Sequence, residues 1–495
     1  MLKWGIALVT LAFIVRILFI FQGGVSFHYD MARDAFEAQQ IWRDHHLKIL
    51  GPPTSTPGLF HGVFYYYLIA PFYMFGSGDP RVVAIFLSFI NCLTIVPIML
   101  LAKDFFKARK WVILSGLLFA VSFEAVQYAP WISDPSPAML TIALFFYFLR
   151  AWQKGNRLGL YFAVFMAALS TQFEFFFLYL FILIPVFLYI FKIRIYLKDI
   201  FISSLIATLG LSSFFIATFK FNSWGLALNG FANIFTPGQL NFRMSFSEQF
   251  LNYINKLTEL FINNFFPVNV FLGGLLMFVV LYFVRKEKFI LFCLFSSLPI
   301  YIFGGHSNVY VNAGLVVPAI LGVVIVLRYL NRYLSLLIIG LIIISNIYAI
   351  FKYSPQGQIM LVIPADMNLK NELRLIDETY KIASGKPFSI NSLTLPLWTN
   401  TTWAYLYSWY GKDKYGYTPY FYGRDQVGLL GVKSMERIEK PLDKTFFIIE
   451  PGDGIPQRFY QEELDTENSK TKLIKEIKYG SIKLQVRSPI TNTNE

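Results

Sequence analysis

Directly after the first apolar segment, residues 28 to 34 (His-Tyr-Asp-Met-Ala-Arg-Asp) bring two carboxylates and a guanidinium together. In a helix, the spacing of four residues places Asp30 and Asp34 on one face, with Arg33 one residue off that face. A carboxylate desolvated at the end of an apolar segment could act as a general base toward an acceptor hydroxyl or amine. A solvated amphipathic surface helix explains the same pattern, and these residues taken alone favour that simpler interpretation.

Further along, a Pro/Gly-rich turn at residues 52 to 62 leads into an aromatic stretch that contains His61, Tyr65 and Tyr66. This pattern is typical of a re-entrant or interfacial element. A plain aromatic belt at a membrane surface explains it equally well.

Two isolated acids and one donor-rich turn also stand at ends of apolar segments. Asp134 precedes a Pro-Ser-Pro run, and Glu174 lies between phenylalanines. Both could face a cavity, although a helix N-cap at Asp134 and an exposed helix end at Glu174 are the simpler interpretations. The turn from Gly304 to Asn312 holds His306 and Tyr310, which could donate to an anionic leaving group or could be chance donors in a tight turn.

The composition shows which elements must position these side chains. The chain has 495 residues, of which 56% are hydrophobic and 15% are charged, and its mean hydropathy is +0.52. So few charges exclude a soluble globular protein. Runs long enough to cross about 30 Å of hydrocarbon predict eleven transmembrane helices, near 2–22, 81–102, 111–127, 136–152, 158–175, 176–192, 199–219, 266–285, 289–304, 311–328 and 333–351.

The connecting segments alternate between basic and non-basic, which predicts their orientation. The basic set holds sixteen Lys and Arg against three acids, which accounts for the whole net charge of +13. By the positive-inside rule these segments are cytoplasmic, so no nucleic-acid surface is needed. We therefore expect a protein of the plasma (inner) membrane with a cytoplasmic N-terminus, a first outer loop at 23–80 and a tail outside the cytoplasm.

The tail from residue 352 to 495 differs in composition from the rest of the chain. It contains 19 basic and 17 acidic residues, in a pattern typical of soluble domains. It predicts a small α/β domain: a helix at 367–382, strands at 388–390 and 445–449, and a hairpin near 474–487. The helices up to residue 351 form the other predicted domain.

The ordered set of segments resembles the GT-C glycosyltransferases of the protein O-mannosyltransferase and aminoarabinose-transferase type. The family's first-loop pattern is Asp-Glu-x-Arg-Tyr, so Asp30 matches its catalytic base and Arg33 its arginine, whereas Met31 and Asp34 replace the Glu and the Tyr. His61 stands where the family usually has Lys, ahead of the retained Tyr65 and Tyr66. The resemblance covers roughly residues 1 to 350.

The resemblance also implies roles for later residues. It places Asp134 at the rim of the active site as a second catalytic acid, and His306 and Tyr310 against the lipid-linked phosphate. We count Asp34 and Glu174 among the substrate-binding candidates, and Arg243 and Lys256, from an expected outer loop at 220–264, are weaker phosphate partners.

The resemblance predicts a hexosyl- or pentosyltransferase that moves a sugar from a polyprenyl-phosphate donor to an acceptor outside the cytoplasm, with inversion. No nucleotide or certain cofactor is expected, and no metal ligands are assigned. Family members differ in divalent metal use, and the acids suggest no obvious cage. The alternative is a lipid or glycan transporter or an assembly subunit without catalysis. The sugar, and whether the acceptor is protein, lipid or polysaccharide, stay open.

Overall fold

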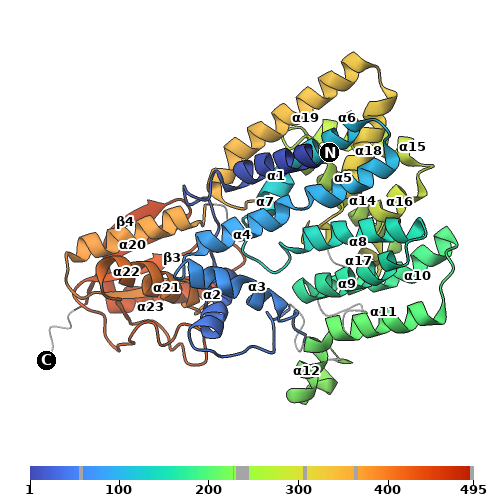
Figure 1. Ribbon diagram of the computed structural model, residues 1–495. Helices are drawn as coiled ribbons and strands as arrows, with labels where there is room; N and C mark the ends of the chain where they lie inside the picture. Colours follow the sequence, from blue (N-terminus) through green and yellow to red (C-terminus); the bar gives the residue numbers. More distant parts are fainter. Residues whose placement is uncertain (55–58, 227, 230–244, 305–308, 362–365, 491–495) are drawn as a thin grey trace.

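A bundle of apolar helices and a small mixed α/β unit make up the chain, and they lie against one another (Figure 1). The computed structural model describes residues 1–54, 59–226, 228–229, 245–304, 309–361 and 366–490. The bundle helices are α1 (Leu2–Ile17), α4 (Pro80–Cys92), α5 (Ile95–Phe105), α6 (Arg109–Ala120), α7 (Phe123–Tyr128), α8 (Ala138–Gln153), α9 (Leu158–Phe173), α10 (Tyr179–Phe191), α11 (Leu197–Gly210), α12 (Ser212–Lys220), α14 (Phe246–Phe265), α15 (Val270–Val284), α16 (Lys288–Leu294), α17 (Leu298–Gly304), α18 (Val316–Tyr329) and α19 (Arg332–Tyr353).

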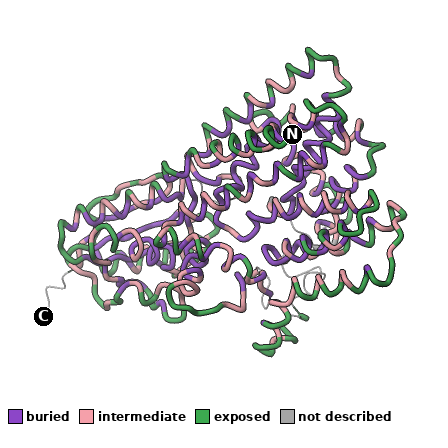
Figure 2. The backbone as a smooth tube through the Cα atoms, in the orientation of Figure 1, coloured by how far each residue is buried: buried purple, intermediate pink, exposed green. Residues whose placement is uncertain are grey.

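Several of these helices present apolar stripes to the outside of the molecule. On α11, Leu197, Phe201, Leu205 and Leu209 recur every four residues and are all exposed. The outer side of α19 is exposed along most of its length (Figure 2). Apolar surface of this extent is stable against lipid rather than water.

By length and composition, two described helical stretches could each cross a membrane alone, Pro80–Phe105 and Arg332–Gln356. Two bent pairs, α11 with α12 and α14 with α15, would raise the number to four. The other apolar helices are shorter than a full crossing, so the number of eleven stays a prediction.

Helix α14 lies within the stretch that the sequence analysis treats as an outer loop. It begins at a capping box in which Ser245 and Glu248 satisfy each other's backbone amides. Its Tyr253, Leu257 and Phe261 are buried in the bundle core. Polar residues on the opposite face lower the mean hydropathy of this segment, which is why a hydropathy window misses it.

One arginine is buried inside the helical bundle. Arg16 on α1 donates to Asn91 on α4 and to the carbonyls of Phe119 and Ala120 at the end of α6. A guanidinium there satisfies helix-end carbonyls that otherwise lack partners. Arg16 therefore has a structural role in joining three helices.

The tail folds around a five-stranded sheet of order β2-β1-β3-β5-β4. Its strands are β1 (Ser389–Leu393), β2 (Tyr420–Phe421), β3 (Thr445–Ile449), β4 (Thr471–Tyr479) and β5 (Ile482–Pro489), and its main helices are α20 (Leu369–Ala383), α21 (Thr401–Leu406), α22 (Lys412–Tyr415) and α23 (Gln457–Lys470). Strands β1, β2 and β3 are parallel, whereas β5 runs antiparallel to β3 and β4. The predicted helix, strands and closing hairpin are confirmed.

The tail is fastened to the first outer loop. Backbone amides of Leu369 and Lys370 donate to the carbonyls of Val25 and Gly23, a few residues before Asp30. Near the other end of this loop, the Gly78 carbonyl accepts a hydrogen bond of 2.6 Å from Tyr405 on α21, which is fully buried. Figure 1 shows the tail elements beside α2 (Tyr29–Trp42) and α3 (Phe64–Phe75), the two helices of this loop.

Candidate functional site

Helix α2 positions the first group of charged side chains. It begins at Tyr29 after the extended residue His28, so Asp30 lies in its first turn. Arg33 lies between the two acids: its Nη1 donates to Asp30 Oδ1 at 2.6 Å, and its Nε donates to Asp34 Oδ1 at 2.9 Å. The three residues thus lie on one helix, as the sequence predicts, and both acids reach the same guanidinium.

The two acids have different surroundings. The Asp30 side chain is 52% exposed, whereas that of Asp34 is 1% exposed. Burial raises the pKa of Asp34 to about 7, although the neighbouring Arg33 charge opposes the rise. Asp30 is thus the carboxylate that an incoming molecule can reach, and Asp34 anchors Arg33 behind it.

The loop before α3 carries His61 into the protein. The His61 amide donates to the Pro52 carbonyl at 2.8 Å, which folds the loop back on itself. The next residue must be glycine, because a Cβ at Gly62 would lie 2.0 Å from Gln172 Oε1 and 2.5 Å from the Gln172 Cα. This close approach sets His61 against the end of α9.

At that point His61 meets the two isolated acids. Its Nδ1 lies 3.1 Å from Glu174 Oε1 and 3.6 Å from Asp134 Oδ2. One ligand atom from each of the three residues lies within 4.8 Å of the others. Asp134 follows α7, and Glu174 joins α9 to the turn before α10, so three separate segments of the chain converge here. These three residues, the His61 triad, could hold a metal ion.

The His61 ring nitrogen that faces the acids acts as an acceptor. The Phe175 amide donates to Nδ1 at 3.1 Å, which places the ring hydrogen on Nε2. Burial and the Arg33 charge lower the pKa of His61 to about 3. Burial also raises the pKa of Asp134, an effect that Arg33 partly offsets. Arg33 therefore acts electrostatically on the triad as well as on Asp30 and Asp34.

Tyrosines line the surroundings of these charges. Tyr65 and Tyr66 are buried on α3, which packs against α2, and this burial, together with the charge of Asp34, raises the pKa of both. Tyr310 lies in a short helix at Val309–Asn312, and its ring centroid is 6.3 Å from that of Trp131. The structure therefore brings Tyr310 beside Trp131, which lies three residues before Asp134.

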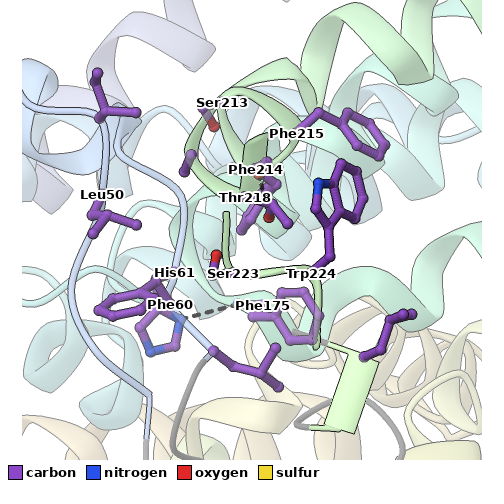
Figure 3. A pocket seen from close by; sticks show the side chains of 14 residues that line it. Leu50, Phe60, His61, Phe175, Ser213, Phe214, Phe215, Thr218, Ser223 and Trp224 are labelled. Carbon is purple, nitrogen blue, oxygen red and sulfur yellow. Dashed lines mark hydrogen bonds between the residues drawn. The ribbon is translucent and has the colours of Figure 1, made fainter. Parts of the chain in front are cut away.

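His61 also lines an apolar cavity of about 230 Å³. Figure 3 shows the imidazole at one side, joined to Phe175 by its hydrogen bond, with Phe214, Thr218 and Trp224 among the labelled residues of the other walls. The walls come from the first outer loop and from α12 and the residues after it. The cavity lining is thus mostly apolar, with the His61 imidazole and a few hydroxyl groups as its polar members.

The sequence does not predict the α12 wall of this cavity, because residues 199–219 are apolar enough and long enough to be interpreted as a single transmembrane helix. The 54° bend between α11 and α12 separates the wall from the preceding helix. The Gly210-Leu211-Ser212 break was its only sequence signal. Of the proposed phosphate partners, Arg243 and His306 lie outside the described residues, and Lys256 pairs with Glu259 at 2.7 Å.

Comparison with known proteins shows which fold carries this arrangement. No protein-family model and no curated protein matches the chain. Among solved structures, ArnT from Cupriavidus metallidurans in the apo state matches with a TM-score of 0.61 at 9% identity, over 98% of both chains. The same protein bound to undecaprenyl phosphate matches with a TM-score of 0.63 at 8% identity, over 99% of this chain and 98% of that one.

A third structure, the archaeal oligosaccharyltransferase AglB from Archaeoglobus fulgidus with an inhibitory peptide and a dolichol-phosphate, matches with a TM-score of 0.46 at 14% identity, over 84% of this chain and 64% of that one. The two ArnT matches span the helical bundle and the tail alike. The chain therefore has the fold of ArnT over nearly its whole length, which is the fold that the resemblance of its ordered segments to the GT-C glycosyltransferases predicts.

Proposed function

We propose that this chain is a membrane glycosyltransferase that takes a sugar from a polyprenyl-phosphate donor and passes it to an acceptor outside the cytoplasm. The observation that carries the proposal is a reachable carboxylate, Asp30, held by Arg33 in a chain with the fold of ArnT over nearly its whole length. One of those ArnT structures contains undecaprenyl phosphate, a ligand of the proposed donor class.

In this proposal Asp30 takes the proton of the acceptor. It is half exposed, so an acceptor can reach it, and its ion pair with Arg33 holds the carboxylate in place. As the acceptor oxygen or nitrogen attacks the anomeric carbon, the bond to the phosphate oxygen breaks on the opposite face. The product sugar therefore has inverted configuration, and the polyprenyl phosphate leaves with its electron pair.

Hydrogen-bond donors close to Asp134 and in the predicted outer loops would stabilise the leaving phosphate. Tyr310 is a candidate from the described residues, and His306 and Arg243 remain candidates from the sequence. Asp34 would hold Arg33, while Tyr65 and Tyr66 would shape the wall beside it. Asp134 and Glu174 would act indirectly, because their carboxylates contact the His61 imidazole at the edge of the cavity.

We propose that the apolar cavity binds the part of the isoprenoid chain that lies next to the phosphate. Its walls include Leu50, Phe214 and Trp224, and His61 marks the polar end. A lipid whose headgroup is charged and whose tail is apolar matches this change in chemistry along the cavity. A nucleotide sugar, which has no apolar tail, would leave these walls unused.

Two experiments test the proposal. The purified chain in liposomes would be given labelled polyprenyl-phosphate sugars and a host envelope extract, with Asp30→Asn as the inactive comparison and Asp44→Asn, an exposed acid of the same loop, as the matched control. Wild type and Asp44→Asn should consume donor and release polyprenyl phosphate, while Asp30→Asn should not.

Lipid and glycan profiling of a host with and without the gene would report the donor and acceptor together. Loss of the gene should raise one lipid-linked sugar and remove one modification from an outer protein, lipid or polysaccharide. A transporter or assembly subunit would instead leave the transfer step intact in broken membranes that lack the protein. That result would overturn the proposal.

A further inference from the structure

The His61 triad brings three hydrogen-bond acceptor atoms together, and among the described residues no donor hydrogen lies between them. Asp134 Oδ2 and Glu174 Oε1 are buried, and within the described part of the chain neither accepts a hydrogen bond. His61 Nδ1 accepts the Phe175 amide, so it carries no hydrogen to offer to Glu174 Oε1, 3.1 Å away. Three electron-rich atoms thus face one another in a buried place, which is costly without a cation.

Arg33, the cation of α2, does not form an ion pair with the triad in the described part of the chain. Arg33 donates to Asp30 and Asp34 on α2. In the described ion pairs, His61 is the one basic partner of either Asp134 or Glu174. The Glu174 side chain is 3% exposed, so water does not compensate for the missing positive charge.

We propose that the His61 triad is a binding site for one divalent transition-metal ion, with His61, Asp134 and Glu174 as its protein ligands. Two carboxylates balance the charge of such an ion, and the imidazole nitrogen favours Mn²⁺ or Zn²⁺ over Mg²⁺ or Ca²⁺.

The distances fit a shared ion. Bonds of about 2.1 Å that meet at angles of 90° to 110° place two ligand atoms roughly 3.0 to 3.5 Å apart. The distance from His61 Nδ1 to Glu174 Oε1, 3.1 Å, lies within this range, and the distance to Asp134 Oδ2, 3.6 Å, lies 0.1 Å beyond it. Coordination would replace the hydrogen bond from the Phe175 amide on Nδ1.

The position of the site lets an ion reach it and lets the bound ion contact a ligand in the cavity. His61 lines the apolar cavity, so an ion and a ligand can approach it from that side. Three protein ligands leave further coordination positions for water or for an oxygen of a bound phosphate. The metal site stands on the triad's geometry, and only its use beside a lipid phosphate depends on the proposed function.

Metal binding would be measured on the purified full-length chain without any donor, so that failure of the transferase proposal cannot affect the result. After removal of metal with a chelator, the protein would be titrated with Mn²⁺, and free Mn²⁺ would be followed by its electron paramagnetic resonance signal. The wild type should bind one Mn²⁺ per chain, and Zn²⁺ should displace it.

The variant Glu174→Gln keeps the shape of the ligand but removes its charge, and should weaken Mn²⁺ binding by more than about tenfold. Glu124→Gln is the matched control, because Glu124 is equally buried but lies in a separate cluster, where it accepts from Asn264. It should bind Mn²⁺ like the wild type. Asp134→Asn provides a second ligand variant if Glu174→Gln does not fold.

Either of two outcomes would overturn the proposal. If the folded wild type binds no Mn²⁺ at millimolar concentration, a shared proton must neutralise the triad instead. If Glu174→Gln and Asp134→Asn both retain wild-type affinity, the bound ion lies elsewhere on the protein.

Discussion

On the proposed function, replacement of Asp30 by asparagine should remove catalysis while leaving the fold intact. The amide keeps the shape of the side chain but cannot take a proton at neutral pH. Loss of a general base costs about 100- to 10,000-fold in turnover, which corresponds to roughly 2.7 to 5.5 kcal/mol of transition-state stabilisation. We expect Asp30→Asn to lose activity in this range.

The effect on stability should be much smaller, because the Asp30 carboxylate is 52% exposed. Its ion pair with Arg33, although short at 2.6 Å, is screened by solvent on one side. Pairs of this kind contribute about 0 to 1 kcal/mol to folding. The melting temperature of Asp30→Asn in detergent should therefore stay close to that of the wild type.

Asp34→Asn should show the opposite pattern. Asp34 is buried, accepts a hydrogen bond from Arg33 Nε and forms an ion pair with Arg33 Nη2, so removal of its charge leaves the guanidinium poorly compensated. An asparagine oxygen still accepts these bonds, and we expect a loss of about 1 to 3 kcal/mol in stability while the folded fraction retains appreciable turnover.

The assay is release of polyprenyl phosphate by purified variants that are matched for folded protein and membrane insertion. Asp44→Asn controls for a change of charge in the same loop. Near wild-type turnover by Asp30→Asn would remove its assignment as the base. Equal loss of turnover in Asp30→Asn and Asp34→Asn would indicate that the two acids act as one unit.

Three further predictions concern stability. Arg16→Met should lower the melting temperature strongly, because helix-end carbonyls inside the bundle lose their donor at about 1 to 3 kcal/mol each; an unchanged melting temperature would contradict the structural role of Arg16. Tyr405→Phe leaves the Gly78 carbonyl without its donor and should speed proteolysis of the first outer loop, whereas Tyr410→Phe, at a half-buried tyrosine of the same segment, should not. Glu372 is fully buried on α20, and burial together with Glu450 raises its pKa, so its contribution to stability is present at acid pH and is lost as the pH rises toward its native pKa. The melting temperature of the full chain should therefore fall between pH 5 and 8, and Glu372→Gln should reduce this slope; part of it should remain because Glu450 has a pKa of about 7. An identical slope in Glu372→Gln would refute the assignment to Glu372.

The tail and the first outer loop illustrate how much of the fold local sequence determines. Five consecutive apolar or β-branched residues at 445–449 predict β3, and the structure confirms its bounds. The i, i+4 spacing of Asp30 and Asp34 likewise predicts their position on α2. Both predictions depend on neighbours within one element, where residue spacing alone sets the geometry.

The His61 triad could not be predicted in the same way. His61, Asp134 and Glu174 are separated by 73 and 40 positions, and their meeting depends on how three outer segments pack. Gly62 permits the close approach, yet its role is visible only when Gln172 lies beside it. Similarly, α14 is amphipathic, and a search for uniformly apolar runs does not detect a helix with one polar face.

The attachment of the tail to the first outer loop has a consequence for synthesis. The carbonyls of Gly23 and Val25 emerge among the first residues made, but their partners, the amides of Lys370 and Leu369, follow some 345 residues later. Until then α2 and its charged residues lack the support that Tyr405 and its neighbours supply. A chain stalled or cut before residue 366 would carry every charged residue of α2 and the whole His61 triad without the contacts that fix the loop. Contacts between such distant parts of a chain form late in folding, so activity should appear only in chains that extend beyond Lys370 and Tyr405.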